Sequence, residues 1–170
     1  MKGSVAAMDI FLNPGEFYFG DSDTRIRTIL GSCVAITLWH PQLRIGGMCH
    51  YMLPARARGK VAALDGRYAD EAMLLLLKEA LRYRSNPYEY QIKLFGGGNM
   101  FSHLPSKSQT PRHLNVADRN VVAGRQLLAQ HGFSIAAEQL GGQGHRQVIF
   151  EIATGDVWVR KHDPVKAPGQ

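Results

Sequence analysis

The alternation of apolar and polar residues along the chain predicts a domain that contains both strands and helices. Short runs rich in branched and aromatic residues, bounded by turns that contain glycine, proline or aspartate, are typical of strands. Such runs predict strands at residues 16–19, 26–30, 33–39, 44–53, 91–95, 133–137, 147–152 and 157–161. Some of these strands follow one another directly, and others are separated by helices. We therefore expect one α+β domain with layered mixed β-sheets, a β-sandwich-like core and two long helices packed outside.

Two longer segments have the apolar spacing of helices. The first spans residues 68–84, and either Asp65 or Asp70 is expected to begin it. Its predicted buried face consists of Ala69, Met73, Leu76, Leu77, Ala80 and Leu81. The second spans about residues 119–131, with Asn115 or Asp118 as its N-cap and Gly132 at its end.

The strands at 33–39 and 44–53 are joined by a short turn, so we expect them to pair as a hairpin. Counting both arms back from a turn centred near Gln42 places residue 33 opposite residue 51. This pairing brings Cys33 close to His50, provided that a bulge or twist puts both side chains on one face.

A thiol beside an imidazole is the minimal machinery of a cysteine hydrolase, and a neighbouring imidazolium lowers the pKa of a thiol. Gly31 permits a close approach of the backbone to a ligand, and the N–H groups near Ser32 and Cys33 can form an oxyanion site. Neither proposed strand contains a carboxylate, so Thr28 and Ser32 are the candidates to orient His50.

Other interpretations of these residues stay open. Cys33 could be a core residue, because cysteine is among the most buried residue types, or it could form a disulfide with Cys49. Cys49 is adjacent to His50 and therefore points to the opposite face of the strand, so we expect it in the core. The three glycines at residues 96–98 lack the lysine of a phosphate-binding loop, which favours a tight turn near the site.

Composition narrows the class of protein. The chain has 170 residues and a net charge of +6, but its basic clusters do not alternate with aromatic residues, so we expect no nucleic-acid partner. An acidic protein partner fits the same charge. The histidines and cysteines show no metal-ligand spacing, and we predict no metal.

The apolar runs and the two cysteines indicate the cellular location of the protein, and the ends of the chain indicate the boundaries of its domain. The longest apolar run, residues 72–77, is far shorter than the roughly 20 residues of a membrane span, and no signal peptide is visible. Two cysteines without a disulfide framework indicate a reducing cytoplasm. We expect flexible termini at residues 1–12 and 162–170 around a domain at residues 13–161.

Five segments in order give the chain a specific resemblance. They are residues 30–35 (LGSCVA), 46–54 (GGMCHYMLP), 93–101 (KLFGGGNMF), 115–120 (NVADRN) and 141–146 (GGQGHR). Together they resemble the CheD family, the chemoreceptor glutamine deamidases of bacterial and archaeal chemotaxis. The resemblance covers nearly the whole chain. Ala117 stands where the family has a glycine, and Gln139 or Leu140 stands where it has an aspartate.

The resemblance implies that Cys33 is the nucleophile, His50 the general acid/base and Thr28 the third catalytic residue. It implies a fold of mixed sheets with helices outside, related to cysteine deamidase toxins. The implied substrate is a glutamine side chain on the cytoplasmic helices of a chemoreceptor, deamidated through a thioester without a cofactor. Hydrolysis of a receptor methyl ester is an implied side activity, and a CheC-type phosphatase is a partner of some relatives.

Two other functions remain to be weighed. One is a cysteine peptidase or small-molecule amidase, although the papain-like and caspase signatures are absent. The other is a non-catalytic module that binds receptors or a CheC-type phosphatase. The presence of both Cys33 and His50 favours the enzyme.

Overall fold

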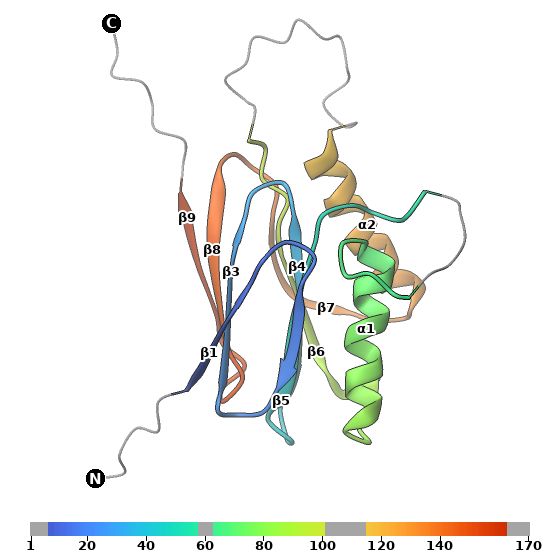
Figure 1. The fold of residues 1–170 in the computed structure, drawn as a ribbon, viewed down its shortest axis with the longest axis vertical. Helices are drawn as coiled ribbons and strands as arrows, with labels where there is room; N and C mark the ends of the chain where they lie inside the picture. The colour runs from blue at the N-terminus through green and yellow to red at the C-terminus, as the bar shows by residue number, and fades with distance from the viewer. Residues whose placement is uncertain (1–6, 58–62, 101–114, 163–170) are drawn as a thin grey trace, which may run out of the picture.

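The computed structural model describes residues 7–57, 63–100 and 115–162, which form two β-sheets and two α-helices in layers (Figure 1). One sheet has four strands in the order β1-β3-β8-β9. Its strands are β1 (Met8–Leu12), β3 (Thr24–Leu30), β8 (His145–Glu151) and β9 (Val157–His162). Both sheets contain parallel and antiparallel pairs, so the predicted layered α+β fold is confirmed.

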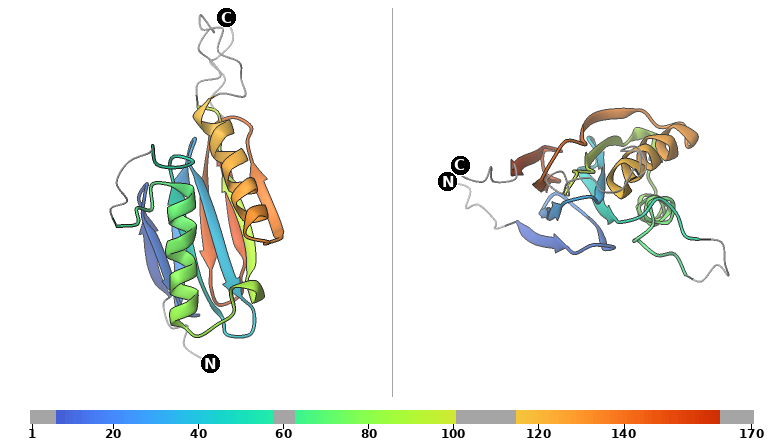
Figure 2. Two further views of the ribbon diagram at one scale, coloured as in Figure 1. Left: turned by 90° about the vertical axis from the view of Figure 1, so that its right-hand side faces the viewer. Right: turned by 90° about the horizontal axis from the view of Figure 1, so that it is seen from above.

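The second sheet has five strands in the order β2-β5-β4-β6-β7, and both helices pack on it. Its strands are β2 (Phe17–Gly20), β4 (Val34–His40), β5 (Ile45–Tyr51), β6 (Gln91–Gly96) and β7 (Ile135–Leu140). The helices are α1 (Ala69–Arg82), α2 (Val116–Gln130) and the short 3-10 turn η1 (Pro87–Glu89). Figure 2 shows α1 and α2 lying across one face of this sheet, on the side away from the four-stranded sheet. No helix in the described residues is long and apolar enough to cross a membrane.

The central position of the five-stranded sheet creates two separate apolar cores. The core between the sheets joins Ile26 and Phe150 to Ala35 and Met48. The core between the sheet and the helices contains the alternate positions of the same strands. Because strand side chains alternate between faces, β4 and β5 are buried on both sides, and all of β5 is buried.

The β4–β5 hairpin is in a register one residue away from the expected one. Ala35 pairs with His50 and Val34 with Tyr51, so Cys33 lies opposite residue 52 rather than residue 51. No bulge interrupts this pairing. Because Cys33 and Ala35 are two residues apart, the corrected register puts Cys33 and His50 on the same face of the sheet without a bulge.

The expected flexible N-terminus is wrong over residues 8–12, which form β1 and pair in parallel with β3. This strand is mostly exposed and only Leu12 is fully buried, and its sequence MDIFL lacks the regular apolar–polar alternation of a half-buried strand. Residues 1–6 and 163–170 lie outside the described part of the chain. β9 includes His162, which we had placed in the C-terminal tail.

Three details of the helices and edges differ from expectation, and one open alternative, the N-cap of α2, is decided. Neither Asp65 nor Asp70 is the N-cap of α1; the N-cap is Tyr68, whose side chain makes no capping hydrogen bond. Leu81 is exposed rather than buried, because α1 turns that position away from the sheet near its end. β7 starts two residues later than predicted, and its boundary is hard to predict because its largely exposed sequence IAAEQL has no regular apolar–polar alternation. Asn115 rather than Asp118 caps α2.

Candidate active site

A hydrogen-bonded chain across the two sheets holds the ring of His50. The hydroxyl oxygen of Thr28, on β3, lies 2.7 Å from Nδ1 of His50 on β5. The same hydroxyl donates to the backbone carbonyl of Leu12 on β1, at 2.8 Å. Leu12 and Thr28 are direct neighbours in the parallel β1–β3 pair, so sheet pairing positions the acceptor. Thr28 and His50 are both buried.

This chain determines which nitrogen of His50 carries the proton. A carbonyl oxygen only accepts, so the single hydrogen of the Thr28 hydroxyl goes to Leu12. The hydroxyl oxygen can then only accept from Nδ1, which must carry a hydrogen. The neutral ring therefore has its lone pair on Nε2. That nitrogen is buried and has no hydrogen-bond partner among the described residues, as expected of a base that awaits its proton donor.

His50 is neutral at neutral pH. Burial lowers the pKa of His50 to about 4, and the negative charge of Glu16 offsets part of that shift. The loop before β2 also holds the backbone, because His50 donates its N–H to the carbonyl of Glu16 and accepts from the N–H of Gly15. Hydrogen bonds to Nδ1 and to the backbone of His50 together fix the position of the ring.

Cys33 lies just before β4 and is half-buried, packed against the core between the sheets. It therefore faces the same layer as His50, although no hydrogen bond joins the two side chains among the described residues. Burial raises the pKa of the Cys33 thiol, and a hydrogen bond from Ser32 offsets part of this effect.

The thiol of Cys33 and the imidazole of His50 are therefore both neutral in the resting protein. This differs from the expected imidazolium, because the buried ring loses more hydration as a cation than the site restores. Ser32 acts on the thiol rather than on the ring, and Thr28 alone of the two candidate orienters contacts His50. The catalytic roles of Cys33, His50 and Thr28 remain predictions.

The turn at residues 31–33 is held by residues 96–99, which follow β6 and are called the glycine loop below. Gly98 donates its N–H to the carbonyl of Gly31, and Gly97 donates to the carbonyl of Cys33, both at 2.8 Å. The loop needs glycine at this point, because Gly97 has φ +65° and a side chain there would meet Val121. A Cβ at Gly31 would lie 3.2 Å from Met100, so Gly31 gives room for that side chain.

Comparison with known proteins identifies the family. A family model described as "CheD chemotactic sensory transduction" matches residues 52–161. The chain belongs to the CheD family. The "Probable chemoreceptor glutamine deamidase CheD" of Pseudomonas savastanoi pv. phaseolicola is 53% identical over 167 residues, covering 98% of this chain and 92% of the relative. "Probable chemoreceptor glutamine deamidase CheD 1" of Leptospira interrogans is 38% identical over 157 residues, covering 91% and 93%.

The segments that resemble the CheD family meet around the turn of Cys33. The glycine loop contacts that turn, and Asn99 within it donates to Gly142 and accepts from Gly144. Of the two departures from the family pattern, Ala117 is buried in α2 near the loop. Gln139 contributes its backbone carbonyl, which accepts a hydrogen bond from the buried guanidinium of Arg146.

Cys49 lies on the opposite face of the hairpin from Cys33, the candidate nucleophile. It is fully buried in the core beneath the helices, and burial raises the pKa of its thiol to about 12. Both cysteines are free thiols, so the alternative of a Cys33–Cys49 disulfide is wrong. The expectation that Cys49 is a core residue is confirmed.

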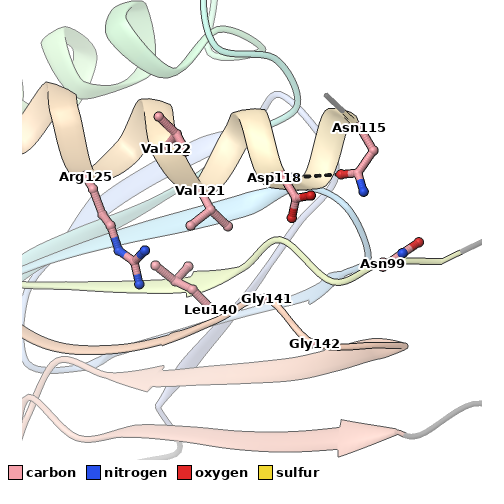
Figure 3. Close-up of a pocket in the computed structure, with 9 residues that line it drawn as sticks. All are labelled: Asn99, Asn115, Asp118, Val121, Val122, Arg125, Leu140, Gly141 and Gly142. Atoms are coloured by element: carbon pink, nitrogen blue, oxygen red, sulfur yellow. Dashed lines mark hydrogen bonds between the residues drawn. The ribbon is translucent and has the colours of Figure 1, made fainter. Parts of the chain in front are cut away.

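A pocket of about 600 Å³ lies beside the glycine loop, between α2 and the end of β7. Figure 3 shows Val121 and Arg125 of α2 pointing toward Leu140 across it. Cys33, His50 and Thr28 do not line this pocket. The described residues contain no cluster of three or more side chains suited to bind a metal ion.

Proposed function

We propose that this chain is a chemoreceptor glutamine deamidase in which Cys33 is the nucleophile and His50 the general base and acid. The observation that carries the proposal is the Leu12–Thr28–His50 chain, which leaves a buried lone pair on Nε2 of a ring that shares its face of the sheet with Cys33. The printed names of the relatives support the choice of a glutamine side chain as substrate.

The first half of the reaction forms a thioester. Nε2 of His50 takes the proton of the Cys33 thiol while sulfur attacks the amide carbon of the glutamine side chain, and a carbon–sulfur bond forms. Backbone N–H groups of the turn at residues 31–33 stabilise the oxyanion. The carbon–nitrogen bond then breaks, and the leaving ammonia takes the proton from Nε2.

The second half regenerates the enzyme. Nε2 takes a proton from water as the water attacks the thioester carbon. The carbon–sulfur bond breaks, glutamate leaves, and the proton returns to sulfur. Thr28 keeps the hydrogen on Nδ1 throughout, so the same nitrogen serves each transfer.

The surface near the site suits a helical protein substrate. Leu53 and Met100 are exposed apolar side chains next to β5 and to the turn of Cys33. In the segment after β5, Arg56 forms an ion pair with Glu71, and residues 58–62 lie outside the described chain. The net charge of +6 would mainly speed the encounter with acidic receptor helices. We infer a cytoplasmic location with the receptor substrate; a CheC-type phosphatase is a further proposed partner, supported by family membership.

Intact-mass measurement of a receptor cytoplasmic fragment after incubation with the protein tests the proposal. Deamidation replaces –NH₂ by –OH, so the fragment gains the corresponding small mass and stays uncut. Cleavage of the fragment would indicate a peptidase. An unchanged fragment that nevertheless binds the protein would indicate a non-catalytic module.

A further inference from the structure

The backbone of the turn that carries Cys33 is held at three successive carbonyl groups. The carbonyls of Gly31 and Cys33 accept from backbone N–H groups of the glycine loop. The middle carbonyl, of Ser32, accepts instead from a side chain, Nδ2 of Asn120, at 3.1 Å. Asn120 is therefore the one side chain in this set of three donors, and the only one of them that a substitution can remove.

Asn120 also ties the turn to the strand of His50. Its Nδ2 group donates a second hydrogen bond to the carbonyl of Met52, at 2.8 Å, two residues beyond His50. Its backbone carbonyl accepts from the hydroxyl of Tyr51, which fixes this position of α2 against β5. The side chain is completely buried. An amide NH₂ has two hydrogens, so both are used on carbonyls of the two candidate catalytic segments.

The direction of the Ser32 carbonyl determines where the Cys33 N–H points. In a trans peptide the carbonyl and the following N–H are antiparallel, and the described residues contain no cis peptide. Because Asn120 draws the Ser32 carbonyl toward α2, the N–H of Cys33 points away from α2. That direction leads to the layer between the sheets, where the thiol of Cys33 packs.

We propose that Asn120 is a positioning residue that aims the Cys33 N–H as the oxyanion donor of the deamidation. The inference rests on the proposed role of Cys33 as nucleophile. The amide of a nucleophile is well placed for this task, because the oxyanion forms on the oxygen of the same carbon that the attacking sulfur bonds. Asn120 touches neither sulfur nor substrate and acts through the Ser32–Cys33 peptide.

A comparison of two reactions of Cys33 separates positioning of the amide from a general effect on the site. Deamidation passes through an oxyanion, whereas alkylation by iodoacetamide displaces iodide at a saturated carbon and needs only the thiolate. Asn120→Leu keeps the approximate size of the side chain and removes both donors. We expect it to lower kcat by about 10²- to 10³-fold, with KM and the Cys33 alkylation rate each within about threefold of wild type.

Leu127→Ala is the matched control for damage to the helix. Leu127 lies on the same helix and is buried in the core against the sheet, away from the turn. We expect this variant to lower the thermal midpoint at least as much as Asn120→Leu while its kcat stays near wild type. Asn120→Ser replaces Asn120→Leu if the latter does not fold, and failure of both to fold would overturn the proposal.

The remaining outcomes decide between the two proposals. Full kcat in Asn120→Leu, or equal losses of kcat and alkylation rate, would overturn the role of Asn120. Cys33→Ala is measured in parallel. If Cys33→Ala still deamidates the receptor fragment, the proposed nucleophile is wrong; if it is inactive while Asn120→Leu is fully active, only the role of Asn120 is lost.

Discussion

The β4–β5 hairpin carries a buried histidine near each end, and the two are partnered in opposite ways. Nδ1 of His40 accepts from the backbone N–H of Leu43, so Nε2 carries the hydrogen and donates to Glu89 at 2.8 Å. Both nitrogens of His40 are thereby used to hold the hairpin turn and η1. His50 has a partner only at Nδ1, and its Nε2 is left without one among the described residues.

The comparison teaches how a structural histidine differs from a candidate catalytic one at equal burial. A buried polar atom without a partner carries a cost in folding free energy of about 1–3 kcal/mol. Such a cost is expected where the atom has a task in catalysis. A similar contrast distinguishes the cysteines. Cys49 is fully buried in the core between the five-stranded sheet and the helices, whereas Cys33 is half-buried between the two sheets.

The largest effect should come from the two cysteines. Cys33→Ala should lose deamidation by more than about 10⁴-fold, because no other group in the proposed mechanism can form the thioester. Cys49→Ala should keep wild-type kcat and lose about 1 kcal/mol of unfolding free energy from the small cavity. Intact-mass kinetics and chemical denaturation measure the two quantities. Equal activity of the two variants would remove the distinction between the faces of the hairpin.

The two histidine variants should differ in kcat almost as much as the two cysteine variants. His50→Ala should lower kcat by about 10²- to 10⁴-fold, because the base and the acid are removed together. His40→Ala should retain kcat while losing about 1–3 kcal/mol of unfolding free energy, because the Leu43 N–H loses its acceptor. A loss of kcat in His40→Ala at full stability would contradict its structural role.

Thr28 should have an intermediate effect. Thr28→Ala, or the isosteric Thr28→Val, should lower kcat by about 10- to 10³-fold, because orientation and tautomer are weakened while nucleophile and base remain. Thr28→Ser should recover part of the loss. Thr37→Val, at a buried threonine of β4, is the control and should leave kcat unchanged. Wild-type turnover by Thr28→Val would mean that the contact with His50 is only structural.

The pH dependence of alkylation tests the neutral resting pair. Because burial raises the pKa of the Cys33 thiol, the iodoacetamide rate should climb by about tenfold per pH unit up to and beyond pH 9. A plateau near neutral pH would indicate a thiolate–imidazolium pair instead. Mass spectrometry of peptides distinguishes Cys33 from Cys49, which should stay unlabelled while the protein is folded.

The last expected effect is on stability at acidic pH rather than on the rate of the reaction. An unfolded His50 takes up a proton near pH 6.5 and the folded one only near pH 4, so the unfolded state binds more protons between these values. This contribution to stability is complete above pH 6.5 and is lost as the pH falls toward 4. Wild type should therefore lose about 3 kcal/mol more than His50→Asn over this range in urea denaturation. Parallel curves for the two proteins would show that burial does not lower the pKa of His50.

Most elements and the hairpin could be predicted from the sequence because they follow local periodicity and turn residues. β4, β5 and α1 agree with their predicted segments within two residues. The missed strand β1 and the displaced strand β7 are largely exposed, and neither has the regular apolar–polar alternation that marks a half-buried strand. The hairpin register was missed by one residue because the turn alone does not specify which residues face each other.

Part of the candidate site could likewise be predicted from the sequence, and part of it could not. The sequence by itself predicted that Cys33 and His50 lie on the two arms of one hairpin, and it offered Thr28 and Ser32 as the groups that orient the ring. Only the tertiary structure decided the acceptor for Thr28, which is Leu12 on a strand that local patterns did not reveal. It also showed that Asn120, near the start of α2, donates to carbonyls 88 and 68 positions away in the sequence.

The physical reason is that protonation depends on surroundings that no local pattern contains. The tautomer of His50 follows from a carbonyl on another sheet, and its lowered pKa follows from burial between two sheets. Residue type and spacing specify which groups can react. The packing of distant segments specifies which nitrogen is free, which thiol is accessible and where each backbone N–H points.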